Sequence, residues 1–91
     1  MVNNYYAVCF KQKDTKTRYL LLSERKDGKF HTELDIFDYD FFISSIEERR
    51  EFKNRIVFDI EDNIMIKIKE HYDVLGNCIY KIDKDTIEGK L

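Results

Sequence analysis

Proline and tryptophan are absent from this chain of 91 residues, and alanine occurs once, at Ala7. Glycine and cysteine are scarce as well, with three and two residues, whereas isoleucine, lysine, asparagine, aspartate and tyrosine are frequent. Such a bias is typical of AT-rich genomes. Because small acidic proteins of this kind are common products of bacteriophages and other mobile elements of low-GC bacteria, a phage or mobile-element protein is the expected origin.

Long hydrophobic runs are also missing. No apolar stretch approaches the roughly 18 residues that a helix needs to cross a bilayer. The N-terminal residues MVNNYYAVCFKQK lack the basic start and the continuous apolar segment of a signal peptide. The sequence therefore predicts a soluble cytoplasmic protein, located in the host cytoplasm if a phage encodes it, and no membrane partner.

Neither sign of charge dominates the chain. Charged residues make up 37% of it, yet they nearly cancel and leave a formal net charge of −2. A protein with so little net charge has no overall electrostatic attraction to nucleic acid or to an anionic membrane. Binding of either kind would require a local patch of charge.

Cysteine and histidine are too few and too far apart for a compact zinc site, which needs four converging thiolates or imidazoles. The four candidates are Cys9, His31, His71 and Cys78. Two free, buried thiols are expected in a reducing cytosol, and a disulfide between the two cysteines is the less favoured alternative. A Cys–His catalytic pair and magnesium binding by paired carboxylates have no motif to support them. We therefore expect no enzymatic activity, no metal and no cofactor.

Large apolar side chains are what the chain has in abundance. The composition is 43% hydrophobic and 14% aromatic, with seven phenylalanines and six tyrosines. Aromatic residues bury large surfaces, so the chain has enough apolar material to fold. Its length fits one small domain spanning residues 1–91.

Strand signals dominate the first third of the chain. Residues 5–13 and 18–24 are rich in the aromatic and apolar residues that suit a pleated surface. A three-residue loop at 14–16 would set Phe10 opposite Leu20 and Val8 opposite Leu22. Alternation then assigns one face to Tyr6, Val8 and Phe10 and the other face to Tyr5, Ala7 and Cys9.

A second loop, at 26–28, ends on Gly28, which suits the left-handed last position of a three-residue hairpin loop. The chain then returns through residues 29–34, with Phe30, Thr32 and Leu34 expected to point inward. The first third is therefore predicted to be a three-stranded meander.

The middle of the chain carries helix signals. Asp38 precedes an apolar run as a capping residue does, and the most favoured prediction is one helix over about 39–54, with Phe42, Ile46 and Phe52 toward the sheet. The sequence Ser-Ile-Glu-Glu that starts at Ser45 has the spacing of a capping box, so a helix that begins after Ser45 is the alternative.

Alternation returns after the helix and predicts a second set of strands. Residues 56–60 are predicted to form a hairpin with the start of a strand that continues from 64 to about 74. After a turn at 75–77, a third strand would return beside it and end at Ile82, with Tyr72 opposite Tyr80. The hairpin would build one apolar ladder from Ile56, Phe58, Ile60, Ile64, Ile66 and Ile68. The tail either frays or packs Ile87 and Leu91 onto the sheet.

The predicted fold is therefore an α+β domain in the order βββ-α-βββ, with a largely antiparallel sheet and one main helix on a sheet face. Whether the six strands form one sheet, two sheets or a barrel-like wrap stays open. So does the choice between a monomer and a homodimer.

The two halves differ in charge. Residues 34–62 contain nine acidic and four basic residues, whereas residues 1–32 contain seven basic and three acidic ones. Carboxylates beside exposed aromatic rings can present negative charge at phosphate-like spacing together with rigid contact area. We assign partner binding to the acidic and aromatic residues of this middle segment, namely Asp35, Asp38, Tyr39, Asp40, Glu47, Glu48 and Glu51.

The sequence thus predicts a non-enzymatic inhibitor or modulator that mimics nucleic acid. Its expected target is a host or defence protein such as a nuclease, for example a CRISPR-Cas effector. A solvated start of a helix whose aromatic rings belong to the core is the simpler interpretation of the same segment.

The alternative function is a small nucleic-acid-binding module. It would use the basic N-terminal hairpins, with tyrosine rings for stacking. The residues concerned are Lys11, Lys13, Lys16, Arg18, Arg25, Lys26 and Lys29, with Tyr5, Tyr6 and Tyr19.

Overall fold

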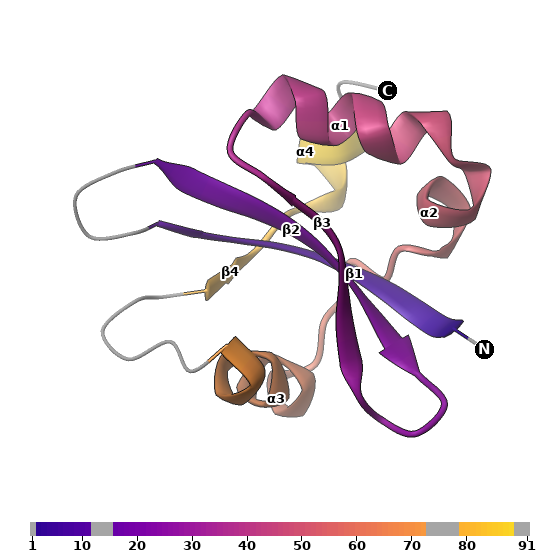
Figure 1. Cartoon of the computed structure of the whole chain (residues 1–91), viewed down its shortest axis with the longest axis vertical. Helices are drawn as coiled ribbons and strands as arrows, with labels where there is room; N and C mark the ends of the chain where they lie inside the picture. Colours follow the sequence, from indigo (N-terminus) through magenta and orange to yellow (C-terminus); the bar gives the residue numbers. More distant parts are fainter. Residues whose placement is uncertain (1, 12–15, 73–78, 89–91) are drawn as a thin grey trace.

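The computed structural model describes residues 2–11, 16–72 and 79–88, and it shows an α+β fold (Figure 1). A four-stranded antiparallel sheet lies between helices, with α3 on one side and α1 and α4 on the other. The elements in chain order are β1 (Val2–Lys11), β2 (Thr17–Arg25), β3 (Phe30–Ile36), α1 (Tyr39–Glu48), α2 (Arg50–Arg55), α3 (Asp62–Tyr72), β4 (Ile79–Lys81) and α4 (Lys84–Glu88). The predicted class is confirmed, whereas the order βββ-α-βββ is wrong in its second half.

The sheet order is β3-β2-β1-β4. Val8 lies opposite Leu20 and Tyr6 opposite Leu22, so the predicted pairing of β1 with β2 was shifted by two residues. A shift of two keeps every side chain on its predicted face, because strand side chains alternate with a period of two. Among the described residues, the last pair of β1 with β2 joins Lys11 to Thr17, and most of the predicted loop at 14–16 lies outside the described residues.

The β2–β3 hairpin has the predicted three-residue loop. The Arg25 N–H donates to the Lys29 carbonyl at 2.9 Å, and the Gly28 N–H donates to the Arg25 carbonyl at 2.8 Å. Gly28 has a φ of 82°, the left-handed conformation that glycine adopts without a steric penalty. The glycine therefore fixes where β3 begins.

A β-bulge in β3 overturns one predicted orientation. Leu21 pairs with Leu34 and Leu22 pairs with Thr32, which leaves Glu33 as the extra residue. The bulge moves Leu34 to the face opposite Phe30, where Leu34 is half-buried, and Thr32 is exposed. The prediction that Phe30, Thr32 and Leu34 share one inward face is therefore wrong for Leu34. Thr32 keeps the predicted face, because it pairs with Leu22, but it is exposed and not buried.

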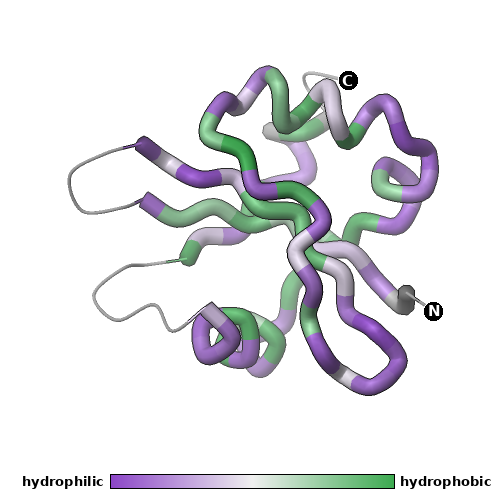
Figure 2. The backbone as a smooth tube through the Cα atoms, in the orientation of Figure 1, coloured by the Kyte–Doolittle hydropathy of each residue, from purple (hydrophilic) through white to green (hydrophobic). Residues whose placement is uncertain are grey.

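Both faces of the sheet are buried, each under its own helices. Figure 2 shows the hydrophobic stretches gathered along the middle of the sheet and in the helices around it. The face under α3 carries one cluster, formed by Tyr6, Val8, Phe10, Leu20, Leu22, Phe30, Ile60, Met65, Ile68 and Ile79. The face under α1, α2 and α4 carries the other, formed by Tyr5, Ala7, Leu21, Phe42, Ile43, Ile46, Phe52, Ile82 and Ile87.

The predicted helix over about 39–54 is two helices, because Arg49 adopts an extended conformation between α1 and α2. The interruption re-aims α2, so that the Phe52 ring meets the Tyr5 ring edge-on at 5.0 Å between centroids. Phe42, Ile46 and Phe52 are buried as predicted. The Ser45 hydroxyl donates to the Phe41 carbonyl at 2.8 Å inside α1, so the helix does not start after Ser45.

The predicted hairpin of residues 56–60 and 64–68 is wrong. Residues 62–72 form α3, and the preceding segment makes a single parallel bridge in which the Val57 N–H donates to the Tyr5 carbonyl at 2.8 Å. The apolar residues of α3 are compatible with the spacing of a strand and with that of a helix. Met65 and Ile68 are buried at helical spacing, whereas Ile66, which period-two alternation placed inward, is 55% exposed.

The C-terminal strand is present but pairs differently from the prediction. Tyr80 lies opposite Cys9, so β4 pairs with β1. The predicted turn at 75–77 and its neighbour Cys78 lie outside the described residues. Ile87 in α4 is 1% exposed, so the tail packs on the sheet at this point, and Leu91 again lies outside the described residues.

Two alanine substitutions in α3 test this arrangement. Ile68→Ala removes a fully buried side chain and should lower the free energy of unfolding by about 2–5 kcal/mol. Ile66→Ala truncates an exposed side chain and should change it by less than about 0.5 kcal/mol. Urea unfolding followed by circular dichroism measures both values, and equal losses at the two positions would contradict a helix here.

Candidate functional site

The candidate site is the outer side of α1. The inner side buries Phe42, Ile43 and Ile46 against the sheet. Helical geometry leaves the outer side to three carboxylates, Phe41 and Ser44, and no basic residue occurs between Tyr39 and Glu48. We call the exposed acidic and aromatic residues of this side and of the turn before it the acidic-aromatic surface, which consists of Phe37, Asp38, Asp40, Phe41, Glu47 and Glu48.

Two phenylalanines stand out on this surface. Phe37 is 53% exposed and Phe41 is 62% exposed, on either side of Asp38 in the chain. Neither ring belongs to the two buried core clusters, whereas the neighbouring Phe42 does. Sequence reasoning missed Phe41, although the helical spacing of the inward residues Phe42, Ile43 and Ile46 leaves Phe41 on the opposite side of the helix.

Some of the acidic residues have a structural role. The Asp38 carboxylate caps α1 by accepting the Phe41 N–H at 2.8 Å, and Asp40 lies in the first turn, where negative charge is favourable. Glu47 and Glu48 lie in the last turn, where the helix dipole disfavours negative charge. Helix stability therefore does not explain the two glutamates.

Tyr39 joins the surface to the core. It is half-buried, and its ring lies 5.1 Å from the Tyr19 ring of β2, centroid to centroid. Tyr19 also packs 5.7 Å from Phe42. The ring of Tyr39 is thus held in place and keeps one exposed part.

Asp35 lies on the other face of the sheet. It pairs with Leu20, a residue of the cluster under α3, and opposite residues of paired strands share a face. Its carboxylate accepts Nε of Arg18 at 3.0 Å and also contacts Nη2 of Arg18. The guanidinium stacks in turn over the Phe10 ring at 5.0 Å. The structure therefore separates Asp35 from the acidic-aromatic surface.

Glu51 also has partners within the protein. Its carboxylate accepts the hydroxyl of Tyr5 at 2.7 Å and lies 3.9 Å from Nη1 of Arg55. Burial of the phenol, followed by the hydrogen bond and the negative charge of Glu51, raises the pKa of Tyr5 to about 12. Glu51 thus holds α2 onto the sheet.

Two basic residues of the first hairpins also form ion pairs within the protein. Arg18 pairs with Asp35, and Arg25 Nη2 lies 3.4 Å from Glu33 Oε1. Tyr5 and Tyr6 are buried, so their rings offer no stacking face. Lys13 lies outside the described residues.

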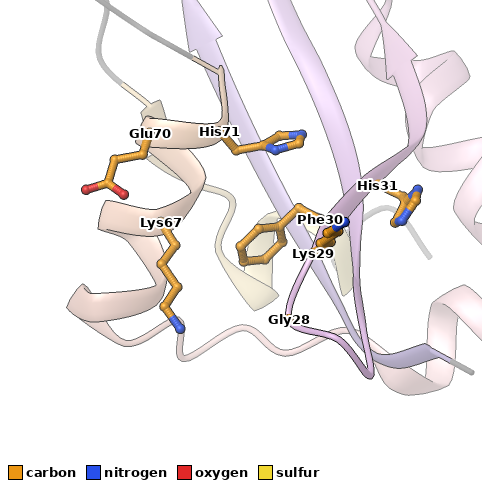
Figure 3. Close-up of a pocket in the computed structure, with 7 residues that line it drawn as sticks. All are labelled: Gly28, Lys29, Phe30, His31, Lys67, Glu70 and His71. Carbon is orange, nitrogen blue, oxygen red and sulfur yellow. The ribbon is translucent and has the colours of Figure 1, made fainter.

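Two basic residues lie around a hollow of about 470 Å³ between the β2–β3 hairpin and α3 (Figure 3). Lys29 and Lys67 line it, and the Phe30 and His71 rings lie 6.1 Å apart within it. Figure 3 shows Glu70 pointing away from the sheet and His31 on the far side of β3. The side chains therefore do not converge on a single point.

The described residues offer little support for a metal site or a reactive thiol. In residues 2–11, 16–72 and 79–88 there is no group of three or more His, Cys, Asp or Glu side chains that could hold a metal ion. Cys9 is a free, half-buried thiol whose pKa is raised by burial, and Cys78 lies outside these ranges. None of the described helices is both long enough and apolar enough to cross a membrane.

Comparisons with protein-family models, with curated proteins and with solved structures find no match. Conclusions about function therefore depend on the geometry of the surfaces described above.

The Tyr5–Glu51 contact gives a prediction about pH. Because burial and the hydrogen bond to Glu51 favour the neutral phenol in the folded state, the stability linked to the raised pKa of Tyr5 is present below pH 10.0 and is lost as pH rises toward about 12. In Glu51→Gln the pKa of Tyr5 should fall but stay above 10.0, because burial still raises it. Titration of the Tyr5 ring carbons by NMR measures this, with Glu47→Gln as the control, and an unchanged pKa in Glu51→Gln would contradict the contact.

Proposed function

We propose that the protein is a non-enzymatic inhibitor or modulator that binds a basic surface of another protein through its acidic-aromatic surface. A basic surface of that kind is what a nucleic-acid-binding protein presents to phosphates. The expected target is therefore a host or defence protein such as a nuclease, with a CRISPR-Cas effector as one example. The composition bias toward an AT-rich phage or mobile element supports this choice of target.

The observation that carries the proposal is the exposure of Phe37 and Phe41 among carboxylates. Rigid aromatic side chains provide most of the energy at many protein interfaces, and surrounding charges select the partner and speed its approach. Glu47 and Glu48 support the proposal further, because they occupy helix positions where they cost stability. Binding would explain why the chain carries them there.

Charge removal on α1 tests the proposal. The binding protein is purified after capture from a host lysate, and association is measured by biolayer interferometry at low and high salt. The triple variant Asp40→Asn, Glu47→Gln and Glu48→Gln should associate about tenfold more slowly at low salt, and the difference should shrink at high salt. Phe41→Ala should instead raise the dissociation rate, by about 30-fold if the ring is a hot spot worth about 2 kcal/mol.

The matched control removes three carboxylates on the α3 side of the sheet, by Glu61→Gln, Asp62→Asn and Glu70→Gln. This variant has the same net charge as the triple α1 variant, so a general charge effect would slow both alike. Wild-type kinetics of the α1 variant at low salt, or equal slowing of both variants, would overturn the proposal.

The nucleic-acid alternative is favoured by one observation: both Lys29 and Lys67 line the hollow in Figure 3. Under this alternative, Lys29→Gln with Lys67→Gln should weaken binding to single-stranded DNA and RNA and make its salt dependence shallower. Fluorescence anisotropy with labelled oligonucleotides measures both. The proposed function predicts no specific binding by the wild type and hence no change.

A further inference from the structure

A second hollow, of about 330 Å³, lies beside the first turn of α1, where Tyr39 meets Tyr19 of β2. We call it the tyrosine pocket, and its lining residues are Cys9, Tyr19, Tyr39, Lys81, Ile82 and Asp83. We propose that the tyrosine pocket binds an arginine side chain of the protein partner. This inference rests on the proposed function, because it gives the acidic-aromatic surface its anchoring point.

The walls of the pocket suit a flat cation. Tyr19 and Tyr39 are half-buried, with ring centroids 5.1 Å apart and ring planes at 58°. The face of a tyrosine ring attracts a cation, and a guanidinium also stacks on it as a flat group. Packing of Tyr19 against Phe42 at 5.7 Å fixes one wall before any ligand arrives.

The charges around the pocket are those that an arginine requires. Asp83 is an exposed carboxylate in the lining, and a carboxylate is the partner whose geometry matches a guanidinium. Asp38 lies close enough for its charge to contribute, after burial and Cys9, to the raised pKa of Tyr19. Negative charge therefore reaches the pocket from two segments of the chain.

Lys81, the basic residue among the described lining residues, does not oppose this. It pairs with Val8, a member of the cluster under α3, and opposite residues of paired strands share a face. Its neighbour Tyr80 pairs with Cys9, a residue packed on the other cluster, and is 56% exposed. The pleat thus directs the Lys81 side chain away from the pocket and places Tyr80 on the same face of the sheet as Cys9.

A matched pair of small probes tests the assignment. N-acetyl-arginine methylamide is titrated into the wild-type protein while backbone amide shifts are followed by NMR, and the citrulline analogue, which has the same shape without the charge, is titrated separately. The arginine probe should give saturable shifts at Tyr19, Tyr39 and Asp83 with a millimolar dissociation constant, and the citrulline probe should not. Equal binding of the two, tighter binding of the leucine analogue or no binding of any probe would overturn the inference.

Variants locate the probe. Asp83→Asn removes the charge while keeping a residue that caps a helix well, which matters because Asp83 directly precedes α4. This variant and Tyr39→Leu should each weaken the arginine probe at least fivefold. Asp85→Asn removes a nearby exposed carboxylate that does not line the pocket, and it should leave the affinity unchanged. A loss as large in Asp85→Asn would show that only the general negative charge attracts the probe, which contradicts the assignment.

The test of the tyrosine pocket can fail independently of the test of the proposed function. If the probes fail while the α1 charge variant still slows association with the protein partner, the pocket assignment is wrong and the surface stands. If the probes behave as expected while the α1 variant binds the partner normally, the surface is wrong and the pocket remains an arginine site.

Discussion

Burial of β1 and β2 on both faces is the constraint on which the other elements depend. Tyr5, Tyr6, Ala7 and Val8 are all nearly inaccessible, and Leu20–Leu22 are fully buried, although consecutive strand residues point to opposite faces. A sheet of this kind must be covered on both sides. The chain meets this demand with α3 on one side and with α1, α2 and α4 on the other (Figure 1).

This constraint also separates folding from binding in α1. Phe42, Ile43 and Ile46 fix the inner side of the helix, and the Asp38 cap fixes its start. The outer residues Phe41, Glu47 and Glu48 are left without a structural task, and a helix packed so firmly presents them in a rigid arrangement. The same packing sets Tyr39 against Tyr19 and so shapes the pocket next to the surface.

The sequence was informative where a local rule decides the structure. Gly28 located the β2–β3 hairpin, and Asp38 located the start of α1, because a left-handed turn and a helix cap each depend on one residue. The prediction for the second half of the chain failed because its apolar residues match two spacings. Ile64, Ile66 and Ile68 have the spacing of a strand, whereas Met65, Ile68 and Tyr72 have the spacing of a helix. Three consecutive leucines in β2 signal a strand buried on both faces, which requires a helix on each side, and that demand favours the helix for residues 62–72. The bulge at Glu33 and the pairing of β4 with β1 depend on contacts distant in sequence.

Hydrogen–deuterium exchange of this protein, alone and bound to its purified protein partner, tests the central claim that α1 carries the binding surface. The account predicts slower exchange in residues 37–48 and in residues 79–83, with no change in the β2–β3 hairpin or in α3. Protection confined to residues 26–31 and 66–71, around the basic hollow, would contradict it.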